Sequence, residues 1–182
     1  AGVIGVVLEE LHPAGASGRD DVAALPARWA GTVMVPAQLA VVDPQDVFRP
    51  RTPFAAWHAA VALAAGRDTA GLARLGRYAA SGPGPVFPAV IAPLAAGLRA
   101  YVEGRYDAAA ALLMAVRRNE VALGGSSAQR EVIEDTLLDA LLAAGRLAQA
   151  RSLIEHRLDR RPSRRDQRRL YQLTGFPESR PA

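Results

Sequence analysis

One pattern occurs three times in this chain, as Gly66-Arg67-Asp68-Thr69-Ala70, Gly104-Arg105-Tyr106-Asp107-Ala108 and Gly145-Arg146-Leu147-Ala148-Gln149. Each Gly-Arg pair ends a run rich in alanine and leucine, and another such run follows it. The three glycines are separated by 38 and 41 residues, a spacing typical of stacked helical repeats. We therefore expect each pair to form the bend of an antiparallel helical hairpin, and the three hairpins to pack side by side.

The composition agrees with an all-α fold. A chain of 182 residues suits one domain. Half of the residues are apolar but only 5% are aromatic, so the core consists mainly of alanine, leucine and valine, which favour close packing of helix on helix. There is no cysteine for a disulfide or a thiolate metal site. No apolar run approaches the ~20 residues that span a bilayer, so no membrane contact is expected.

The hairpins are predicted to begin at Thr52-Pro53, where threonine caps the first helix and proline takes its first position. We interpret residues 1–52 as N-terminal helices and a connector that continue a longer repeat array, and residues 53–182 as three hairpins plus a polar C-terminal capping helix. The start without Met suggests a fragment or a processed chain. The helices expected after the connector cover residues 53–65, 68–80, 88–103, 107–121, 126–145, 146–159 and 163–173.

A family resemblance narrows this architecture. Counted from the turns, Gly97, Ala109, Ala150 and Pro162 fall where the tetratricopeptide unit of about 34 residues has small residues and a closing proline. The segments 104–113, 123–130 and 139–150 resemble the family of tetratricopeptide repeat protein 38, over most of residues 1–175. That family typically has Gly-Gly-Ser-His-Ala-Gln-Arg-Asp at the second loop, whereas Ser127 and Glu131 replace its His and Asp here. The resemblance implies a right-handed helical solenoid of undefined biochemical role, and supplies no reaction.

The loop at Ser126-Ser127-Ala128-Gln129-Arg130 is the strongest candidate for a binding site. Its hydroxyl, amide and guanidinium groups at a helix N-terminus could form a platform for an anion. The alternative is ordinary capping by one of the two serines, with Arg130 paired to Glu134 one turn later. We favour capping.

Histidine offers no recognisable catalytic or metal motif. His58 follows Trp57 on the first hairpin helix; it could line a groove, but a half-buried packing role is the commoner situation. His12 and His156 have no second histidine at zinc-ligand spacing. The sequence also contains no nucleophile elbow and no phosphate-binding glycine loop. We expect no catalytic residue, metal or cofactor.

Charge is concentrated near the C-terminus. All 22 basic residues are arginine, and the net charge is +4. Residues 151–169 hold eight arginines against three acids, which gives +5 and leaves −1 for the remaining chain. Glu131, Asp135 and Asp139 form an acidic stripe at four-residue spacing just before this segment. The stripe and the arginines could bind a basic peptide or phosphate groups, but we favour a solvated face and a charged cap partly neutralised by pairs four residues apart.

These features together predict a non-catalytic interaction scaffold. The first helices of the hairpins are expected to line a concave face that binds a protein segment or a second copy of the chain. One alternative is an accessory part of a larger enzyme whose catalytic residues lie outside these 182 residues. Another is phosphate or nucleic-acid contact through residues 151–169, which the scarcity of aromatic residues there disfavours. The absence of lysine and the high content of Ala, Gly and Arg are typical of proteins encoded by GC-rich bacterial genomes. We expect a cytoplasmic location. The candidate groove residues are His58, Arg99, Ser127, Gln129, Arg130, Glu134 and Asp135.

Overall fold

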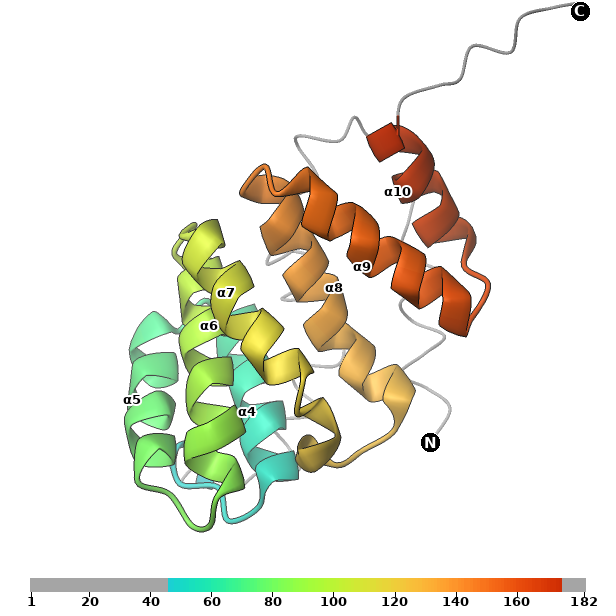
Figure 1. Ribbon diagram of the computed structural model, residues 1–182. Helices are drawn as coiled ribbons and strands as arrows, with labels where there is room; N and C mark the ends of the chain where they lie inside the picture. The colour runs from blue at the N-terminus through green and yellow to red at the C-terminus, as the bar shows by residue number, and fades with distance from the viewer. Residues whose placement is uncertain (1–45, 175–182) are drawn as a thin grey trace, which may run out of the picture.

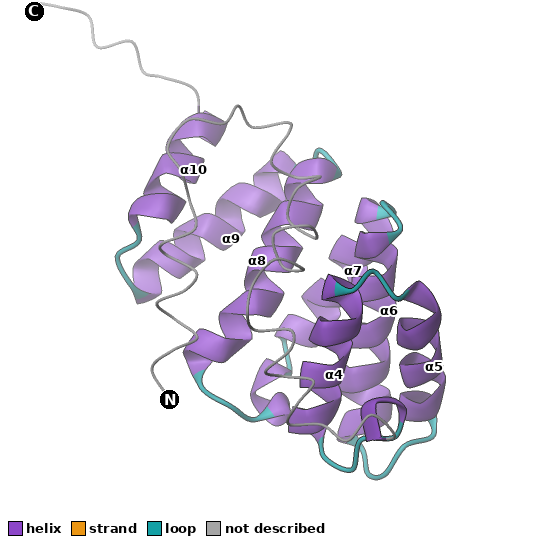
Figure 2. Cartoon of the chain, turned by 180° about the vertical axis from the view of Figure 1, so that it is seen from behind, coloured by secondary structure: helices purple, strands orange, loops and turns teal. Residues whose placement is uncertain are grey.

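The computed structural model describes residues 46–174, and the helices expected before residue 46 lie outside this range. The described part contains helices and loops but no strand (Figures 1 and 2), which confirms the all-α prediction there. Three short helical segments accompany the main helices: η1 (Asp46–Phe48), the π-helical turn η2 (Phe87–Ile91) and η3 (Glu120–Leu123). The main helices are α4 (Pro53–Ala65), α5 (Thr69–Ala80), α6 (Ala92–Val102), α7 (Tyr106–Arg117), α8 (Ser127–Ala143), α9 (Leu147–Arg160) and α10 (Arg164–Thr174).

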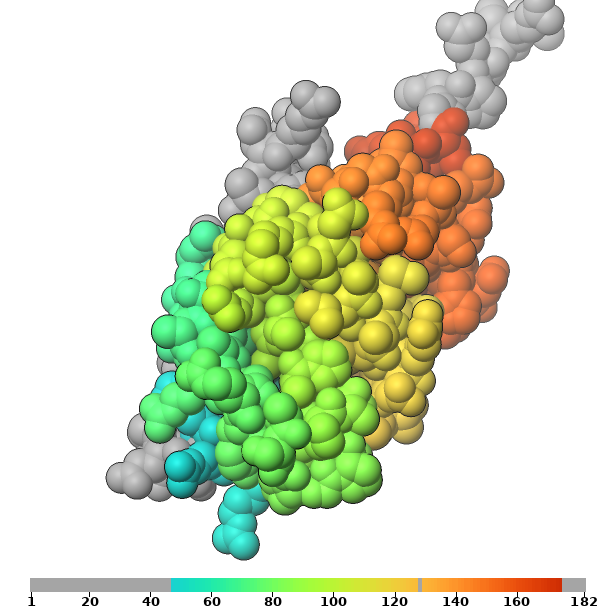
Figure 3. All heavy atoms as spheres, turned by 60° about the vertical axis from the view of Figure 1, so that its left-hand side comes forward, coloured from blue at the N-terminus to red at the C-terminus, as the bar shows by residue number. Residues whose placement is uncertain are grey.

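Each helix packs against the next one along the chain, so that three pairs follow one another in space (Figure 1). The pairs are α4 with α5, α6 with α7, and α8 with α9, and α10 lies against α9. The core between them is mostly aliphatic, and Leu94, Leu98 and Leu113 are almost completely buried. In Figure 3, α5, α6 and α7 form one continuous face in green and yellow-green, with α9 beyond it in orange.

All three predicted bends are present and have the same backbone geometry. In each, the N–H two residues after the helix cap donates to a carbonyl five residues earlier: Asp68 to Leu63 (2.9 Å), Arg105 to Ala100 (2.8 Å) and Arg146 to Leu141 (2.8 Å). This bond, with the shorter one inside it, defines the Schellman motif that ends many helices. The motif requires one residue with positive φ.

That residue is not the same one in all three turns. Gly104 and Gly145 have φ of 75° and 71°, but Gly66 has φ of −76° and Arg67 takes the left-handed position with φ of 55°. The glycine pattern is therefore one residue out of register with the structure in the first turn. Because α4 ends at Ala65, the cap falls on Gly66 and the left-handed position falls on the following arginine.

This offset predicts different costs for replacing the three glycines by alanine. At Gly104 and Gly145 a Cβ would meet nothing within 4 Å, so the loss in the free energy of unfolding, about 1 kcal/mol, comes from the positive φ alone. At Gly66 the change should stay within about 0.5 kcal/mol, since its φ suits alanine. Urea denaturation followed by circular dichroism measures all three variants. Equal losses at the three sites would contradict the offset.

Candidate functional site

The start of α8 is capped as predicted, by Ser126. Its Oγ accepts a hydrogen bond from the Gln129 N–H (3.2 Å), and the Gln129 side-chain oxygen accepts one from the Ser126 N–H (2.8 Å). This capping box satisfies two backbone donors at the helix N-terminus, where an anion would otherwise bind. Ser127 is the first residue of α8 and is exposed.

Arg130 binds the loop before α8 rather than Glu134. Its guanidinium donates to the carbonyl oxygens of Gly124 (3.1 Å) and Gly125 (2.6 Å). The prediction that Arg130 pairs with Glu134 is wrong. Glu134 faces α7 and α9 instead, where it accepts hydrogen bonds from Arg117 and Arg160. Arg130 thus holds the glycine loop in place.

The same loop packs against the aromatic side chains of α4. The His58 ring lies 4.4 Å from Phe54 and 4.5 Å from Trp57, between ring centres. His58 is half-buried, and burial lowers its pKa. Gly125 lies so close to Phe54 and Trp57 that a Cβ on it would approach their rings within 3.1 and 3.2 Å. The residues predicted on α4 and at the start of α8 therefore lie close together, where the glycine loop meets α4. We call this contact the α4–α8 junction; its predicted residues are His58, Ser127, Gln129 and Arg130.

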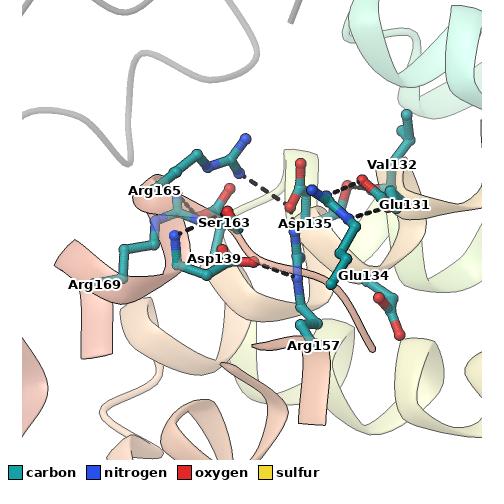
Figure 4. Close-up of polar contacts among 12 residues, drawn as sticks. Glu131, Val132, Glu134, Asp135, Asp139, Arg157, Ser163, Arg165 and Arg169 are labelled. Carbon is teal, nitrogen blue, oxygen red and sulfur yellow. Dashed lines mark hydrogen bonds and ion pairs between the residues drawn. The ribbon is translucent and has the colours of Figure 1, made fainter. Parts of the chain in front are cut away.

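The acidic stripe of α8 and the arginines of α9 and α10 bind each other (Figure 4). Asp135 accepts from Arg157 (2.6 Å) and Arg165 (3.0 Å), and Arg157 also pairs with Asp166 of α10 (3.0 Å). We call the following residues the charge cluster: Glu131, Glu134, Asp135, Asp139, Arg157, Arg160, Arg161, Arg165, Asp166 and Arg169.

The centre of the charge cluster is buried, which corrects the expectation of a solvated face, while Arg160 and Arg161 at its edge are exposed. Asp166 is 1% exposed and Arg157 is 4% exposed. Pairs four residues apart do occur, as between Arg151 and Glu155 (2.7 Å), but the main partners lie on different helices. Six of the eight arginines in residues 151–169 have a carboxylate partner: Arg151, Arg157, Arg160, Arg161, Arg165 and Arg169. These guanidinium groups are already occupied, which disfavours phosphate binding through this segment.

Burial and ion pairing oppose each other at the carboxylates of the cluster. Burial raises the pKa of Asp135, but the positive charges of Arg165 and Arg157 outweigh it and leave that pKa below its ordinary value. For Asp139 burial prevails and raises the pKa to about 6, because Arg169, its ion-pair partner (3.2 Å), is opposed by the charge of Asp135. The pKa values of these two carboxyl groups of α8 are thus shifted in opposite directions from their ordinary value.

The raised pKa of Asp139 predicts a specific pH dependence of stability. Ionising this carboxyl group is harder in the folded state (pKa about 6) than in the unfolded chain (about 3.9), so its contribution to stability falls as the pH rises from about 4 to about 6. Relative to the wild type, Asp139→Asn should gain about 2 kcal/mol in the free energy of unfolding between pH 4 and pH 7. Urea denaturation at both pH values measures it.

Asp159→Asn is the matched control, because Asp159 is exposed and its carboxylate forms no ion pair with any residue between 46 and 174. The change between pH 4 and pH 7 should be clearly larger for Asp139→Asn than for this control. A pH-independent difference for Asp139→Asn would contradict the role given to burial.

Arg99, the remaining predicted residue, lies apart from both places. It pairs with Glu103 (2.7 Å), which also pairs with Arg105 (2.5 Å), at the exposed end of α6. These two arginines lower the pKa of Glu103, Arg105 more strongly. The seven predicted residues are therefore distributed over the α4–α8 junction, the charge cluster and the end of α6.

A groove that the sequence did not reveal lies between α7 and α9, with α8 as its floor. In Figure 1, α8 is visible between these two helices. Ion pairs lie toward both ends of α7 and α9: Asp107 with Arg146 (3.8 Å) where these helices begin, and Glu134 with both Arg117 (2.8 Å) and Arg160 (2.5 Å) where they end. The volume of the groove is about 310 Å³. The lining residues are Met114, Arg117 and Arg118 from the end of α7, Leu137 and Leu141 from α8, and Gln149, Ser152, Leu153 and His156 from α9.

No protein-family model, curated protein or solved structure matches the chain. The likeness to tetratricopeptide repeat protein 38 therefore stays a prediction from the sequence. Between residues 46 and 174, no helix is long and apolar enough to cross a membrane. In that same part of the chain, no three His, Asp or Glu side chains are grouped so that they could hold a metal ion.

Proposed function

We propose that the chain is a peptide-binding scaffold, a stack of tetratricopeptide-type helical hairpins that holds a segment of a partner protein and performs no reaction of its own. Three helix pairs with the same Schellman turn, each packed on the next, support the repeat interpretation. Repeat stacks of this kind commonly present extended binding surfaces.

The α7–α9 groove is the observation that carries the proposal. Because α7 and α9 are the second helices of successive pairs and both begin at the Asp107–Arg146 end, they run in the same direction on either side of α8. At one end Glu134 of α8 connects α7 to α9 through Arg117 and Arg160, and at the other end the exposed Asp107 of α7 lies 3.8 Å from Arg146. The volume of the groove, about 310 Å³, is at the lower end of the range for ligand pockets, ~300–1,000 Å³. The sequence predicted a binding surface lined by the first helices of the pairs, whereas the proposal assigns it to the sides of the second helices, α7 and α9.

Filling the groove tests the proposal. Ser152 is exposed on α9 and lines the groove, so Ser152→Trp should obstruct it without disturbing the core. Peptides selected from a random 12-residue display library against the full chain should bind this variant at least about tenfold more weakly, by fluorescence anisotropy.

Gln167→Trp is the matched control, because Gln167 is exposed on α10 and does not line the groove. Its binding should stay within about twofold of the wild type, and circular dichroism should show both variants folded. A library that yields no binder, or binders that ignore Ser152→Trp, would remove the groove as the functional surface.

A further inference from the structure

We infer that the occupant of the α7–α9 groove is an acidic protein segment that inserts a single apolar side chain; this inference rests on the proposed function. The charged lining residues are all basic or potentially basic: Arg117, Arg118 and His156. No carboxylate lines the groove. A ligand with complementary charge is therefore acidic.

Two carboxylates lie near this end of the groove, Glu134 of α8 and Glu120 of η3, and they do not balance the three arginines Arg117, Arg118 and Arg160. One oxygen of Glu134 accepts from Arg117 (2.8 Å) and the other accepts from Arg160 (2.5 Å). Glu134 is 2% exposed and each of its oxygens already accepts from one of these guanidinium groups, so it is not open to the groove. Arg118, the exposed C-cap residue of α7, is the arginine best placed to bind a carboxylate of the occupant.

The floor limits how much apolar surface the occupant can bury. Leu137, Leu141 and Leu153 are between 1% and 6% exposed, so they present a narrow strip rather than a wide apolar face. Met114 is partly exposed beside them, and its flexible thioether side chain adapts to different shapes. The strip suits one aliphatic side chain, and the remaining affinity must come from charge and hydrogen bonds.

The α9 side of the groove supplies neutral hydrogen-bonding groups. Gln149 and Ser152 lie one helical turn apart on α9, and both line the groove. An amide and a hydroxyl can each bind polar groups of an extended or helical segment. The groove thus combines a basic end, a narrow apolar floor and a polar edge, which fits a short acidic segment with one aliphatic anchor.

The display selection on the full chain tests this chemistry through the composition of the binders. The selected peptides should be enriched in Asp and Glu around one Leu, Ile or Met. Arg118→Glu should weaken their binding at least about tenfold and reduce its dependence on salt. Arg168→Glu is the matched control, because it makes the same change of charge at an exposed arginine of α10 outside the groove; its binding should stay within about threefold of the wild type.

The outcomes separate this inference from the proposed function. Peptides that are blocked by Ser152→Trp but carry no acidic residues would overturn the acidic occupant and leave the peptide-binding scaffold intact. Binders insensitive to both Ser152→Trp and Arg118→Glu would overturn both. Concentration-dependent self-association in sedimentation, lost in Arg118→Glu, would identify a second copy of the chain as the occupant and overturn the inference.

Discussion

Replacing Arg157 by methionine should lower the free energy of unfolding by about 3–5 kcal/mol. The guanidinium of Arg157 connects Asp135 of α8 (2.6 Å) to Asp166 of α10 (3.0 Å) from a position on α9. Asp166 is 1% exposed, so removing its arginine leaves a buried carboxylate without its ion-pair partner. Methionine retains much of the length of the side chain, and the loss should therefore reflect charge more than packing. Urea denaturation measures it.

Two further variants distinguish this explanation from a loss of packing. Arg157→Met with Asp166→Asn removes the stranded charge and should recover a substantial part of the lost stability, because neutralising a buried ion pair costs less than breaking it. Arg151→Met breaks only the exposed pair with Glu155 and should cost at most about 1 kcal/mol. If the double variant is no more stable than Arg157→Met, packing dominates at this position.

The positions of the helices after residue 52 were predictable because their signals are local. Thr52 caps α4 and Ser126 with Gln129 forms the capping box of α8, as the sequence patterns indicate. The predicted helix at residues 88–103 begins instead with the π-turn η2, and α6 follows it. Such local patterns need no knowledge of the rest of the fold.

The pairing of charges was not predictable from spacing. Four-residue spacing places Glu131, Asp135 and Asp139 on one side of a helix, but it does not say which helix covers that side. The arginines that pair with them lie 22 to 30 residues later in the chain. Only the placement of α9 and α10 against α8 turns the stripe into a network of ion pairs between helices, buried at its centre.

The groove was missed for a related reason. Arg117 and Arg118 end one helix, and His156 lies on another with no second histidine at ligand spacing. Each is unremarkable in its own segment. Their common location follows from the parallel course of α7 and α9, which the repeated turns imply but the residue pattern does not mark.

Gly125→Ala should destabilise the fold by about 3 kcal/mol, more than alanine at any of the three hairpin glycines. Its φ of 72° costs about 1–2 kcal/mol for a residue with a Cβ. The new Cβ would also lie 2.8 Å from the Gln129 side-chain oxygen and 3.2 Å from the Trp57 ring, and such overpacking costs about 1–3 kcal/mol. Neither neighbour is free to move, since the Gln129 oxygen caps α8 and Trp57 is 2% exposed. Chemical denaturation measures the loss.

Gly84→Ala isolates the backbone contribution to this effect. Gly84 has nearly the same φ, 76°, but a Cβ there would meet nothing within 4 Å, so its cost should be about 1 kcal/mol. The difference between the two variants therefore measures the contact of the glycine loop with α4 and with the capping box. Because Arg130 binds the carbonyl oxygens of Gly124 and Gly125, the loop cannot swing away without losing these bonds. Equal losses at Gly84 and Gly125 would mean that the loop yields freely and that the α4–α8 junction adds no stability.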